Sequence, residues 1–347
     1  MMSPASPAIV WRKTVVPMVI LLMLVGVFGV GGYVGSNQAI GNKPEWRKMV
    51  HSPAEYNLSS ETVTLQSTDG IPLKAWWLPA QQDAGTHGVG VEQAGTPESL
   101  PTVNVILVHG RDMNRSGMLP RAAFLARHNY NVLDLDLRAH GESGGNYITP
   151  GYREASDVLG GVAHIRGRGE HGPIVVLGYS YGAVAALHAA ALCPDINTVI
   201  ADSAFITPDD VLKNVAHHEG IPLKYKVGIW MAQVPLLDRS TDFFFWVRTG
   251  VKLDRKKASG IAAARRIHDQ SVLYISGRQD WLAPPRNARV MYQETPSARK
   301  GFLLVPGNHN TTYSEAPELY ETNVLAFLNQ YVSRQVMAEI RCRPDED

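Results

Sequence analysis

The sequence predicts an α/β protein with a mostly parallel β-sheet that is covered by helices on both faces. Two observations lead to this fold class. From Val103 onward, short apolar runs alternate with segments that have the length and composition of helices. The runs are apolar at nearly every position, as strands are when both faces of a sheet are covered. The chain has 347 residues, of which 45% are hydrophobic, so it can bury the core that such a sheet needs.

An apolar segment precedes this pattern. Residues 14–35 contain no charged residue over 22 positions, which is about the length of a helix that crosses a hydrocarbon core. Arg12 and Lys13 precede the segment, and Trp11 and Tyr33 flank it as interfacial aromatic residues do. We predict a transmembrane signal anchor. A cleaved signal peptide stays open, although the run is long for one and no clear Ala-x-Ala site follows.

The two ends of the apolar segment carry further signals. The tail at residues 1–13 has two basic residues, and three more lie at 43–48. We expect a single-pass membrane protein with the tail inside and the large domain outside the cytoplasm. Gly31 and Gly35 form a Gly-x-x-x-Gly pair, a pattern that favours helix dimerisation.

A connection and a hairpin follow. Residues 36–58 are expected to connect the span to the domain. The runs 61–66 and 71–78 have strand composition and enclose a Thr-Asp-Gly turn, which predicts a β-hairpin. Residues 80–101 are rich in Gly, Gln, Ala and Thr and lack periodicity, which predicts a mobile surface loop.

The alternating region supplies the sheet. Strands are expected at 103–108, 132–137, 174–178, 198–200, 272–276 and 301–305. Helices are expected at 118–128, 151–166, 181–192, 286–292 and 316–332. Because right-handed crossovers bring the carboxyl ends of parallel strands to one edge of the sheet, a ligand site is expected at that edge.

One motif stands at such a strand end. Residues 178–182 read Gly-Tyr-Ser-Tyr-Gly, between a predicted strand and a predicted helix. A serine at a sharp strand-to-helix turn is held out of the sheet, and glycines at its flanks let neighbouring backbone pass close by. The helix N-terminus directs free N–H groups toward negative charge that develops beside the serine. The motif predicts that Ser180 is a nucleophile, while an ordinary glycine-rich turn stays open on this motif alone.

Two later residues fit this serine as partners. Asp280 and His309 each follow a strand, so they reach the same edge of the sheet as Ser180. In this arrangement His309 takes the serine proton, and Asp280 fixes the tautomer of the imidazole and stabilises its positive form. Asp202 also follows a strand and is the rival acid. Asp280 is preferred because Asp-x-x-x-Pro opens the next helix.

Two backbone N–H groups are expected to hold the charge that develops on the substrate oxygen. One belongs to Tyr181, directly after the serine, and the other to Arg111, in the loop that His109-Gly110 begins. We expect the Arg111 side chain to be solvated, with an acidic substrate group as the alternative partner.

The other titratable residues considered are expected to serve structure. His109 and His140 precede the serine in the chain and are assigned structural roles. Asp134 and Asp136 are expected to serve the loop at their strand end rather than a metal. The pair His217-His218 does not make the His-Glu-x-x-His pattern of zinc proteases.

Composition excludes further classes. The formal charge of +1 comes from 33 basic and 32 acidic residues without long runs, so no electrostatic footprint for nucleic acid exists. The two cysteines, Cys193 and Cys342, have no Cys-x-x-Cys spacing, so neither a disulfide framework nor a zinc site is predicted. No cofactor is implied, because nucleophile and base supply the chemistry themselves.

Six short segments together carry a family resemblance. They are Leu107-Val108-His109-Gly110, residues 136–143 (Asp-Leu-Arg-Ala-His-Gly-Glu-Ser), residues 178–182, residues 201–205 (Ala-Asp-Ser-Ala-Phe), residues 280–284 (Asp-Trp-Leu-Ala-Pro) and Gly307-Asn308-His309. The assembly resembles an α/β-hydrolase of the serine esterase, lysophospholipase and serine-aminopeptidase-like group, in which the triad has the order Ser, Asp, His. The resemblance implies an α/β-hydrolase domain at 59–333, with residues 334–347 as a tail.

The chain departs from the family pattern at two positions. Ala139 stands where many relatives carry glycine, and Tyr181 stands where many carry methionine. Neither departure removes a catalytic group. The ring of Tyr181 is expected to narrow or polarise the entrance to the site.

A long interval between two strands predicts a helical cap. Residues at about 207–268 separate neighbouring strands by far more than a usual crossover, so they are expected to cover the site. The apolar runs 229–231 and 243–247 fit two interpretations, the lining of an acyl pocket and the packing of the cap onto the body.

The resemblance implies a serine hydrolase that cleaves an ester-type bond, such as a carboxylester, thioester or lysophospholipid-like bond, through an acyl-enzyme. A membrane span makes a lipid-like substrate the expected one. A serine peptidase stays open, with Asp209-Asp210 as the candidate pair to hold a substrate amino terminus. A non-catalytic binding protein on the same fold also stays open. The sequence leaves the substrate and the oligomeric state open.

Overall fold

The chain folds into two compact units. The computed structural model describes residues 11, 16–37, 40, 43–81, 101–223, 226, 229, 234–254, 256–332 and 342. We name Met1–Ile40 with Glu219–Leu253 the helical unit, and Gly41–His218 with Asp254–Asp347 the sheet unit. All site residues predicted from the sequence lie in the sheet unit.

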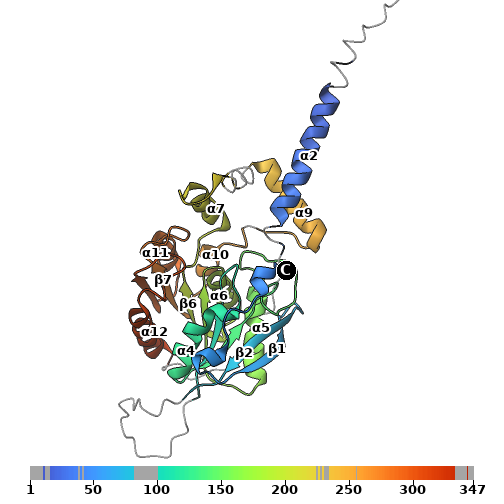
Figure 1. The fold of residues 1–347 in the computed structure, drawn as a ribbon. Coiled ribbons are helices and arrows are strands. Elements are labelled where there is room, and N and C mark those ends of the chain that lie inside the picture. The colour runs from blue at the N-terminus through green and yellow to red at the C-terminus, as the bar shows by residue number, and fades with distance from the viewer. Residues whose placement is uncertain are drawn as a thin grey trace, which may run out of the picture. The chain divides into compact units, whose positions relative to one another are not determined.

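An eight-stranded sheet forms the centre of the sheet unit, among the described residues (Figure 1). Its strands are β1 Glu61–Gln66, β2 Pro72–Leu78, β3 Asn104–Val108, β4 Asn131–Leu135, β5 Ile174–Tyr179, β6 Ile196–Asp202, β7 Ser271–Gly277 and β8 Lys300–Val305. Their order in the sheet is β1-β2-β4-β3-β5-β6-β7-β8. Strand β2 is antiparallel to β1 and β4, and the other neighbouring strands are parallel. The predicted α/β fold with a mostly parallel sheet is confirmed.

The hairpin that opens the sheet matches its prediction. Strand β1 pairs with β2 from Glu61 opposite Trp77 to Gln66 opposite Pro72. Within β1 only Val63 and Leu65 are buried, the alternation of an edge strand with one solvated face. The predicted mobile loop at 80–101 falls mostly on residues 82–100, which lie outside the described residues.

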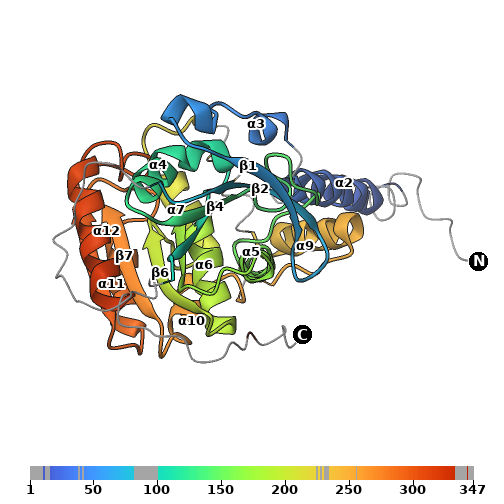
Figure 2. The same cartoon turned by 90° about the horizontal axis from the view of Figure 1, so that it is seen from below.

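Helices pack on both faces of the sheet (Figure 2). The helices of the sheet unit are α3 Pro44–Arg47, η2 Pro53–Tyr56, η3 Arg115–Met118, α4 Leu119–Arg127, α5 Ala155–Gly167, α6 Tyr181–Leu192, α7 Pro208–His217, α10 Gly260–Ala264, α11 Pro285–Glu294 and α12 Pro317–Tyr331. Residues of α5, α6, α10 and α11 join one buried cluster, and residues of α4 and α12 join the other.

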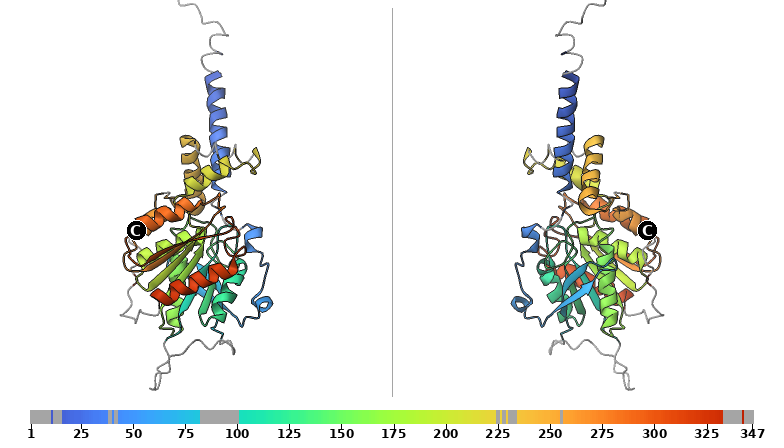
Figure 3. Two further views of the ribbon diagram at one scale, coloured as in Figure 1. Left: turned by 90° about the vertical axis from the view of Figure 1, so that its left-hand side faces the viewer. Right: turned by 90° about the vertical axis from the view of Figure 1, so that its right-hand side faces the viewer.

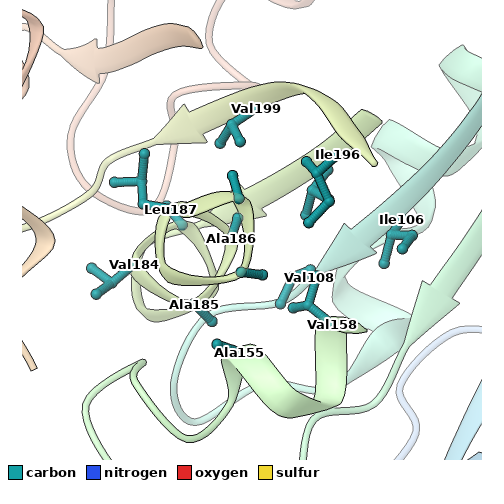
Figure 4. Packing of buried hydrophobic residues seen from close by; sticks show 14 of the residues in the cluster. Ile106, Val108, Ala155, Val158, Val184, Ala185, Ala186, Leu187, Ile196 and Val199 are labelled. Carbon is teal, nitrogen blue, oxygen red and sulfur yellow. The ribbon is translucent and has the colours of Figure 1, made fainter. Parts of the chain in front are cut away.

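Helix α6 is the central helix of the first cluster. Five of its six alanines are buried, and Figure 4 shows Ala185 and Ala186 close to strand residues such as Val108 and Val199. Because an alanine side chain is a single methyl group, the axis of α6 lies close to the sheet. This close approach fixes the position of the residue that precedes α6, which is Ser180.

Helix α5 begins at Ala155, four residues later than residue 151 where the sequence predicted its start. The physical reason is the side chain of Glu154, which is fully buried just before the helix. Its carboxylate accepts hydrogen bonds from the backbone N–H groups of Thr149 and Gly151, at 2.7 and 3.0 Å. These bonds hold residues 149–153 in a turn.

Part of the predicted connection at 36–58 packs onto the sheet unit. Trp46 in α3 is 1% exposed, and its ring stacks on His140 with 4.6 Å between the ring centroids. The carbonyl of Trp46 accepts from the N–H of Gly141 at 3.0 Å, and the Arg47 guanidinium donates to the carbonyls of Gly141 and Ser143. This segment therefore supports the loop that follows β4.

The helical unit contains α2 Val16–Ser36 and α9 Pro235–Thr249. Among the described residues, α2 is the one helix long and apolar enough to cross a membrane. It lies where the sequence predicted an apolar span at 14–35. Helix α9 falls inside the interval predicted as a cap, while α7 and α10, from the same interval, belong to the sheet unit.

The expectation that the cysteines form no disulfide is wrong. Cys193, at the C-terminal end of α6, is joined to Cys342, with 4.2 Å between the Cα atoms. The bond connects residues 149 positions apart, so no local spacing could predict it. Cys342 is the one described residue of the predicted tail at 334–347.

Candidate active site

Ser180 occupies a strained turn between β5 and α6. Its φ is +52° and its ψ −113°, a conformation that L-residues rarely adopt. A Cβ at Gly178 would lie 2.3 Å from the carbonyl oxygen of Gly182, and one at Gly182 would lie 2.4 Å from that of Val108. Both flanking positions therefore require glycine. The N–H of Ser180 donates to the carbonyl of Asp202 at 2.7 Å, which ties the turn to β6.

His309 reaches Ser180 from the loop after β8. The distance from Ser180 Oγ to His309 Nε2 is 2.8 Å. The His309 carbonyl accepts a 2.5 Å hydrogen bond from the hydroxyl of Tyr179, so the residue before Ser180 also fixes the backbone of the histidine. Gly307, with φ +105°, turns the loop back toward the sheet edge.

Asp280 completes a hydrogen-bonded chain with these two residues. Its Oδ2 lies 2.8 Å from His309 Nδ1. Its Oδ1 accepts from the backbone N–H groups of Leu282 and Ala283, at 3.0 and 2.8 Å. The Asp280 side chain is fully buried and that of His309 is 8% exposed. A carboxylate held in this way orients the imidazole with its Nε2 toward the serine hydroxyl.

The rival acid, Asp202, faces a different partner. The Asp202 side chain is fully buried at the end of β6, and its Oδ2 accepts from Arg121 Nη2 at 2.7 Å. The hydroxyls of Thr312 and Tyr320 donate to the same oxygen, each at 3.1 Å. Asp202 therefore serves a buried ion pair, and its backbone carbonyl accepts from the N–H of Ser180.

Arg121 was not predicted as part of the site. This arginine lies in the apolar helix α4, buried, and its guanidinium lies 5.3 Å from the ring centre of Tyr179. The pKa of the guanidinium is raised, because Tyr320 and Asp202 beside it outweigh the effect of burial. A charged residue within an apolar helical stretch was the available signal, but it names no partner.

The ring of Tyr181 does not line an entrance, contrary to the prediction. It is 3% exposed within the core, and its hydroxyl donates to the carbonyl of Thr149 at 2.7 Å. Burial and the nearby Glu154 raise the pKa of this hydroxyl well above its usual value. The residue's backbone is the first position of α6, at the helix N-terminus beside Ser180.

Arg111 lies in the loop after β3. Its side chain is 39% exposed, its Nε lies 3.5 Å from Asp112 Oδ1, and its guanidinium is 5.9 Å from the ring centre of Trp46. The next residue, Asp112, has a φ of +62°, so the chain turns sharply there. The loop passes close to the nucleophile turn, because a Cβ at Gly182 would also lie 2.4 Å from the carbonyl oxygen of His109.

His109 and His140 are buried supports for these loops. The Nδ1 of His109 lies 2.7 Å from the carbonyl of Gly110, and its Nε2 accepts from the N–H of Leu137 at 3.1 Å. Burial lowers the pKa of His109. Burial and the neighbouring His109 hold the pKa of His140 well below its usual value. Both imidazoles are therefore neutral near pH 7 and join the loops after β3 and β4.

Two aspartates at the end of β4 behave differently from each other. Asp136 accepts from the backbone N–H groups of Arg115 and Glu142 and pairs with the Arg115 guanidinium, so it holds the strand-end loop. Asp134 is fully buried, and burial raises its pKa well above the usual range. Among the described residues, one group of side chains lies close enough to share a metal ion, Cys193 and Cys342 with Asp195, but the two cysteines are bonded to each other.

Comparison with known proteins identifies the family. A model of the alpha/beta hydrolase family matches residues 105–328. The chain belongs to this family. The match covers β3 to α12, and with them the three residues of the hydrogen-bonded chain.

Relatives of this α/β hydrolase are known from bacteria and fungi. The uncharacterized protein YqkD of Bacillus subtilis is 28% identical over 267 residues, which cover 76% of this chain and 82% of the relative. Protein bem46 of Schizosaccharomyces pombe is 24% identical, covering 77% of this chain and 76% of the relative. An esterase of Pyrococcus furiosus has a similar structure, with a TM-score of 0.62 and 24% identity over 84% of this chain and 98% of the esterase. The likeness to the esterase shows the fold alone.

Proposed function

We propose that this protein is a membrane-anchored serine hydrolase that cleaves an ester-type bond with Ser180, His309 and Asp280 as its catalytic triad. The bond is a carboxylester, a thioester or a lysophospholipid-like ester. The observation that carries the proposal is the unbroken chain of two 2.8 Å contacts from Ser180 Oγ through the imidazole to Asp280. A serine hydroxyl is a weak nucleophile by itself, and an adjacent oriented base activates it.

The proposed reaction has two halves. In the first, His309 Nε2 takes the hydroxyl proton while Ser180 Oγ bonds to the substrate carbonyl carbon. The histidine then gives this proton to the leaving oxygen or sulfur as that bond breaks, which yields an acyl-enzyme and an alcohol or thiol. In the second half, water gives its proton to His309 and attacks the acyl group, and Ser180 regains the proton as the acid leaves. Asp280 stabilises the positive imidazole in both halves.

The proposed oxyanion hole consists of the backbone N–H groups of Tyr181 and Arg111. The position of Tyr181 supports the first donor, since the first N–H groups of a helix have no partner within the helix. The close approach of Gly182 to the His109 carbonyl supports the second, because it brings the Arg111 loop beside the nucleophile. Both donors carry the partial positive charge of a helix start or a tight loop toward the substrate oxygen.

Helix α7, at the start of the predicted cap, lies beside the loop that holds Asp280. Asn214 of α7 donates to the carbonyl of Leu282 at 2.9 Å, and His218 stacks on Trp281 with 3.9 Å between the ring centroids. These contacts attach α7 to the loop that holds Asp280. The start of the predicted cap at 207–268 is therefore held beside the loop of Asp280, and its Val211 packs against the core of the sheet unit.

Two features support the proposed location, a membrane anchor with the catalytic domain outside the cytoplasm. Helix α2 has the length and apolar composition of a membrane span. The disulfide between Cys193 and Cys342 fits an oxidising compartment, because such bonds are rare in cytosolic proteins.

A fluorophosphonate probe tests the proposed chemistry, since it reacts only with a serine that a neighbouring base activates. Full-length protein in detergent is expected to be labelled at Ser180, and Ser180→Ala is expected to lose both the label and the hydrolysis of acyl esters. Ser203→Ala is the matched control, because Ser203 also has a positive φ at a strand end but lies outside the triad. Equal labelling of wild type and Ser180→Ala, or labelling of neither, would falsify the proposal.

The peptidase alternative receives no support from its candidate residues. Asp210 accepts from the hydroxyl of Thr207, and the Thr207 hydroxyl accepts from the N–H of Asp210, which is a helix-capping arrangement at the start of α7. We therefore rank esters above amides. Faster hydrolysis of aminoacyl-arylamides than of short acyl esters by the unlabelled wild-type enzyme would reverse this ranking.

A further inference from the structure

We propose that α9 is a second membrane-contacting element, whose residues Phe243, Trp246 and Val247 face the lipid interface beside the end of α2. The inference rests on the proposed anchoring by α2. Both helices belong to the helical unit, where they lie side by side (Figures 1 and 3). The partner assigned to this surface is the headgroup and upper acyl region of the bilayer.

Glycines of α2 bring the two helices into close contact. A Cβ at Gly32 would lie 2.4 Å from Ser240 Oγ and 2.8 Å from the backbone carbon of Ser240. One at Gly35 would lie 2.4 Å from Thr241 Oγ1. A Cβ at Gly31 would lie 2.9 Å from Leu237 Cδ2, so the Gly31 and Gly35 pair, which favoured dimerisation of two copies, is occupied by α9 of the same chain.

Polar and aromatic contacts set the relative height of the helices. Arg248 Nη1 donates to Ser36 Oγ at 2.8 Å and to Asn37 Oδ1 at 2.6 Å. The Arg248 guanidinium lies 4.6 Å from the ring centre of Tyr33, and Phe244 meets the same ring edge to face. The C-terminal end of α9 is therefore level with the polar C-terminal end of α2.

The side of α9 that faces away from α2 carries large exposed apolar side chains beside the exposed Arg239. Residues 237, 240, 241, 244 and 248 follow helical spacing and face α2. At 3.6 residues per turn, Trp246 points away from α2, and Phe243 and Val247 lie on the flank next to it. Phe243, Trp246 and Val247 are 54%, 45% and 56% exposed. Phe243 and Trp246 contact each other, with 6.1 Å between the ring centroids. Clustered large apolar side chains on one exposed helix face are typical of an interaction surface.

The height of this surface points to lipid as its partner. The 21 residues of α2 span about 31 Å, close to the thickness of about 30 Å of a hydrocarbon core. When α2 crosses a bilayer, Ser36 therefore lies at the membrane surface, and α9 lies beside the last turns of the span. Tryptophan and phenylalanine are stable at this level, and the bonds of Arg248 to Ser36 and Asn37 hold the polar ends of the two helices together there. The lipids that surround the exposed side chains of α2 therefore also contact the exposed face of α9.

Photolabelling from lipid tests the inference on the full-length protein. The protein is reconstituted in phosphatidylcholine vesicles that contain a phosphatidylcholine with a diazirine on one acyl chain, irradiated and digested, and the lipid adducts are located by mass spectrometry. Adducts are expected on α2 and on Phe243, Trp246 or Val247. A diazirine close to the acyl carbonyl is expected to label α9 more than one at the chain end. Val50 and Leu319, exposed apolar residues of the sheet unit, are internal controls and are expected to stay unlabelled.

The outcomes separate this inference from the anchoring on which it rests. Adducts on α2 without adducts on α9 overturn the inference and leave the anchor in place. Absence of adducts on both helices overturns both, while labelling of Ser180 by fluorophosphonate still reports separately on the proposed catalysis.

A variant supplies the matched comparison. Replacing Phe243, Trp246 and Val247 together by serine is expected to abolish the α9 adducts while the adducts on α2 and the fluorophosphonate labelling persist. Leu319→Ser, an equally exposed apolar residue of the sheet unit, is expected to change neither. Persistence of adducts on the remaining α9 side chains at the wild-type level would show that these three residues do not form the lipid contact.

Discussion

Two buried aspartates, Asp280 and Asp202, lie close to the loop that contains His309. Their contacts differ, so their roles differ. Asp280 contacts the imidazole of His309, whereas Asp202 contacts Arg121 and its backbone carbonyl accepts from the N–H of Ser180. The difference is one of direction: the side chain of Asp202 leaves the end of β6 toward α4 and α12. Substitution of each carboxyl group therefore separates catalysis from stability.

Asp280→Asn is expected to reduce kcat/KM for an acyl ester by about 10³- to 10⁴-fold, because the amide donates a hydrogen bond and traps the wrong imidazole tautomer. Its fold is expected to persist, since the remaining oxygen still accepts from the N–H groups of Leu282 and Ala283. Steady-state kinetics and thermal unfolding check both parts.

Asp202→Asn is the contrasting variant. It leaves Arg121 buried and without its charged partner, so it is expected to lower the free energy of unfolding by about 3 kcal/mol or more. A larger catalytic loss in Asp202→Asn, at equal folded fraction, would make Asp202 the triad acid.

His188 makes the fold sensitive to acid. It is buried in α6, and burial lowers its pKa to about 4, with Arg266 contributing. Below its usual pKa of about 6.5 the unfolded chain binds a proton that folded His188 refuses until about pH 4, so unfolding is favoured as the pH falls through this window. The protein is expected to be about 2 kcal/mol less stable at pH 5 than at pH 7 from this group alone. Thermal unfolding of wild type and of His188→Gln at both pH values measures this loss of stability. An equal pH dependence in the variant would remove His188 as the cause.

At the residue scale, the sequence was informative where chemistry requires a residue type and silent where packing decides. Ser180, Asp280 and His309 follow strand ends in a fixed order, and the structure brings them within hydrogen-bonding distance. Arg121 and Tyr179, which brace the same loops, have no such signature, because their partners depend on how α4 and α12 pack. For Tyr181 the same side chain suits an entrance or a core, and only the position of Thr149 decided between them.

At the scale of elements, the alternation of short apolar runs with helical segments was enough to locate the strands of the parallel part of the sheet. Buried parallel strands are apolar at nearly every position, and helix α6 follows its glycine turn directly, so the bounds of β5 and α6 are clear in the sequence. Side-chain hydrogen bonds set the bounds that the sequence missed, as Glu154 does for α5. The short helix α3 was predicted as part of the connection at 36–58, because only one of its residues, Trp46, is buried against the sheet unit.

Helix α9 shows the same limit over a longer distance. Its sequence contains the apolar run 243–247, which fits burial in a cap as well as exposure to lipid. The deciding feature is α2, about 200 positions earlier in the chain, whose glycines accept Ser240 and Thr241. The sequence of α9 does not show that α9 packs on α2. The exposure of its outer face to lipid could therefore be inferred only from the structure, in which both helices lie in one unit.

At the scale of the whole molecule, the disulfide links the folding of the sheet unit to the compartment in which it folds. The bond closes a loop of 149 residues between the end of α6 and the tail. In the chain-entropy account, a loop of this length removes up to about 5 kcal/mol of unfolded-state freedom. A domain outside the cytoplasm keeps such a bond, and a cytosolic domain loses it to cellular thiols.

Cys342→Ser is therefore expected to lower the free energy of unfolding by about 2 to 5 kcal/mol, since the unfolded chain regains the freedom that the bond removes. Thermal unfolding of the full-length protein with and without reductant measures the effect: reductant is expected to lower the Tm of wild type and to leave that of the variant unchanged.

The redox state of the two cysteines in cells indicates the compartment of the domain. Protein isolated from cells, denatured and alkylated without reduction, is expected to carry no alkyl group on either cysteine if its domain lies outside the cytoplasm. Two alkylated cysteines, together with a Tm that ignores reductant, would place the domain in a reducing compartment and remove the disulfide from the account of its stability.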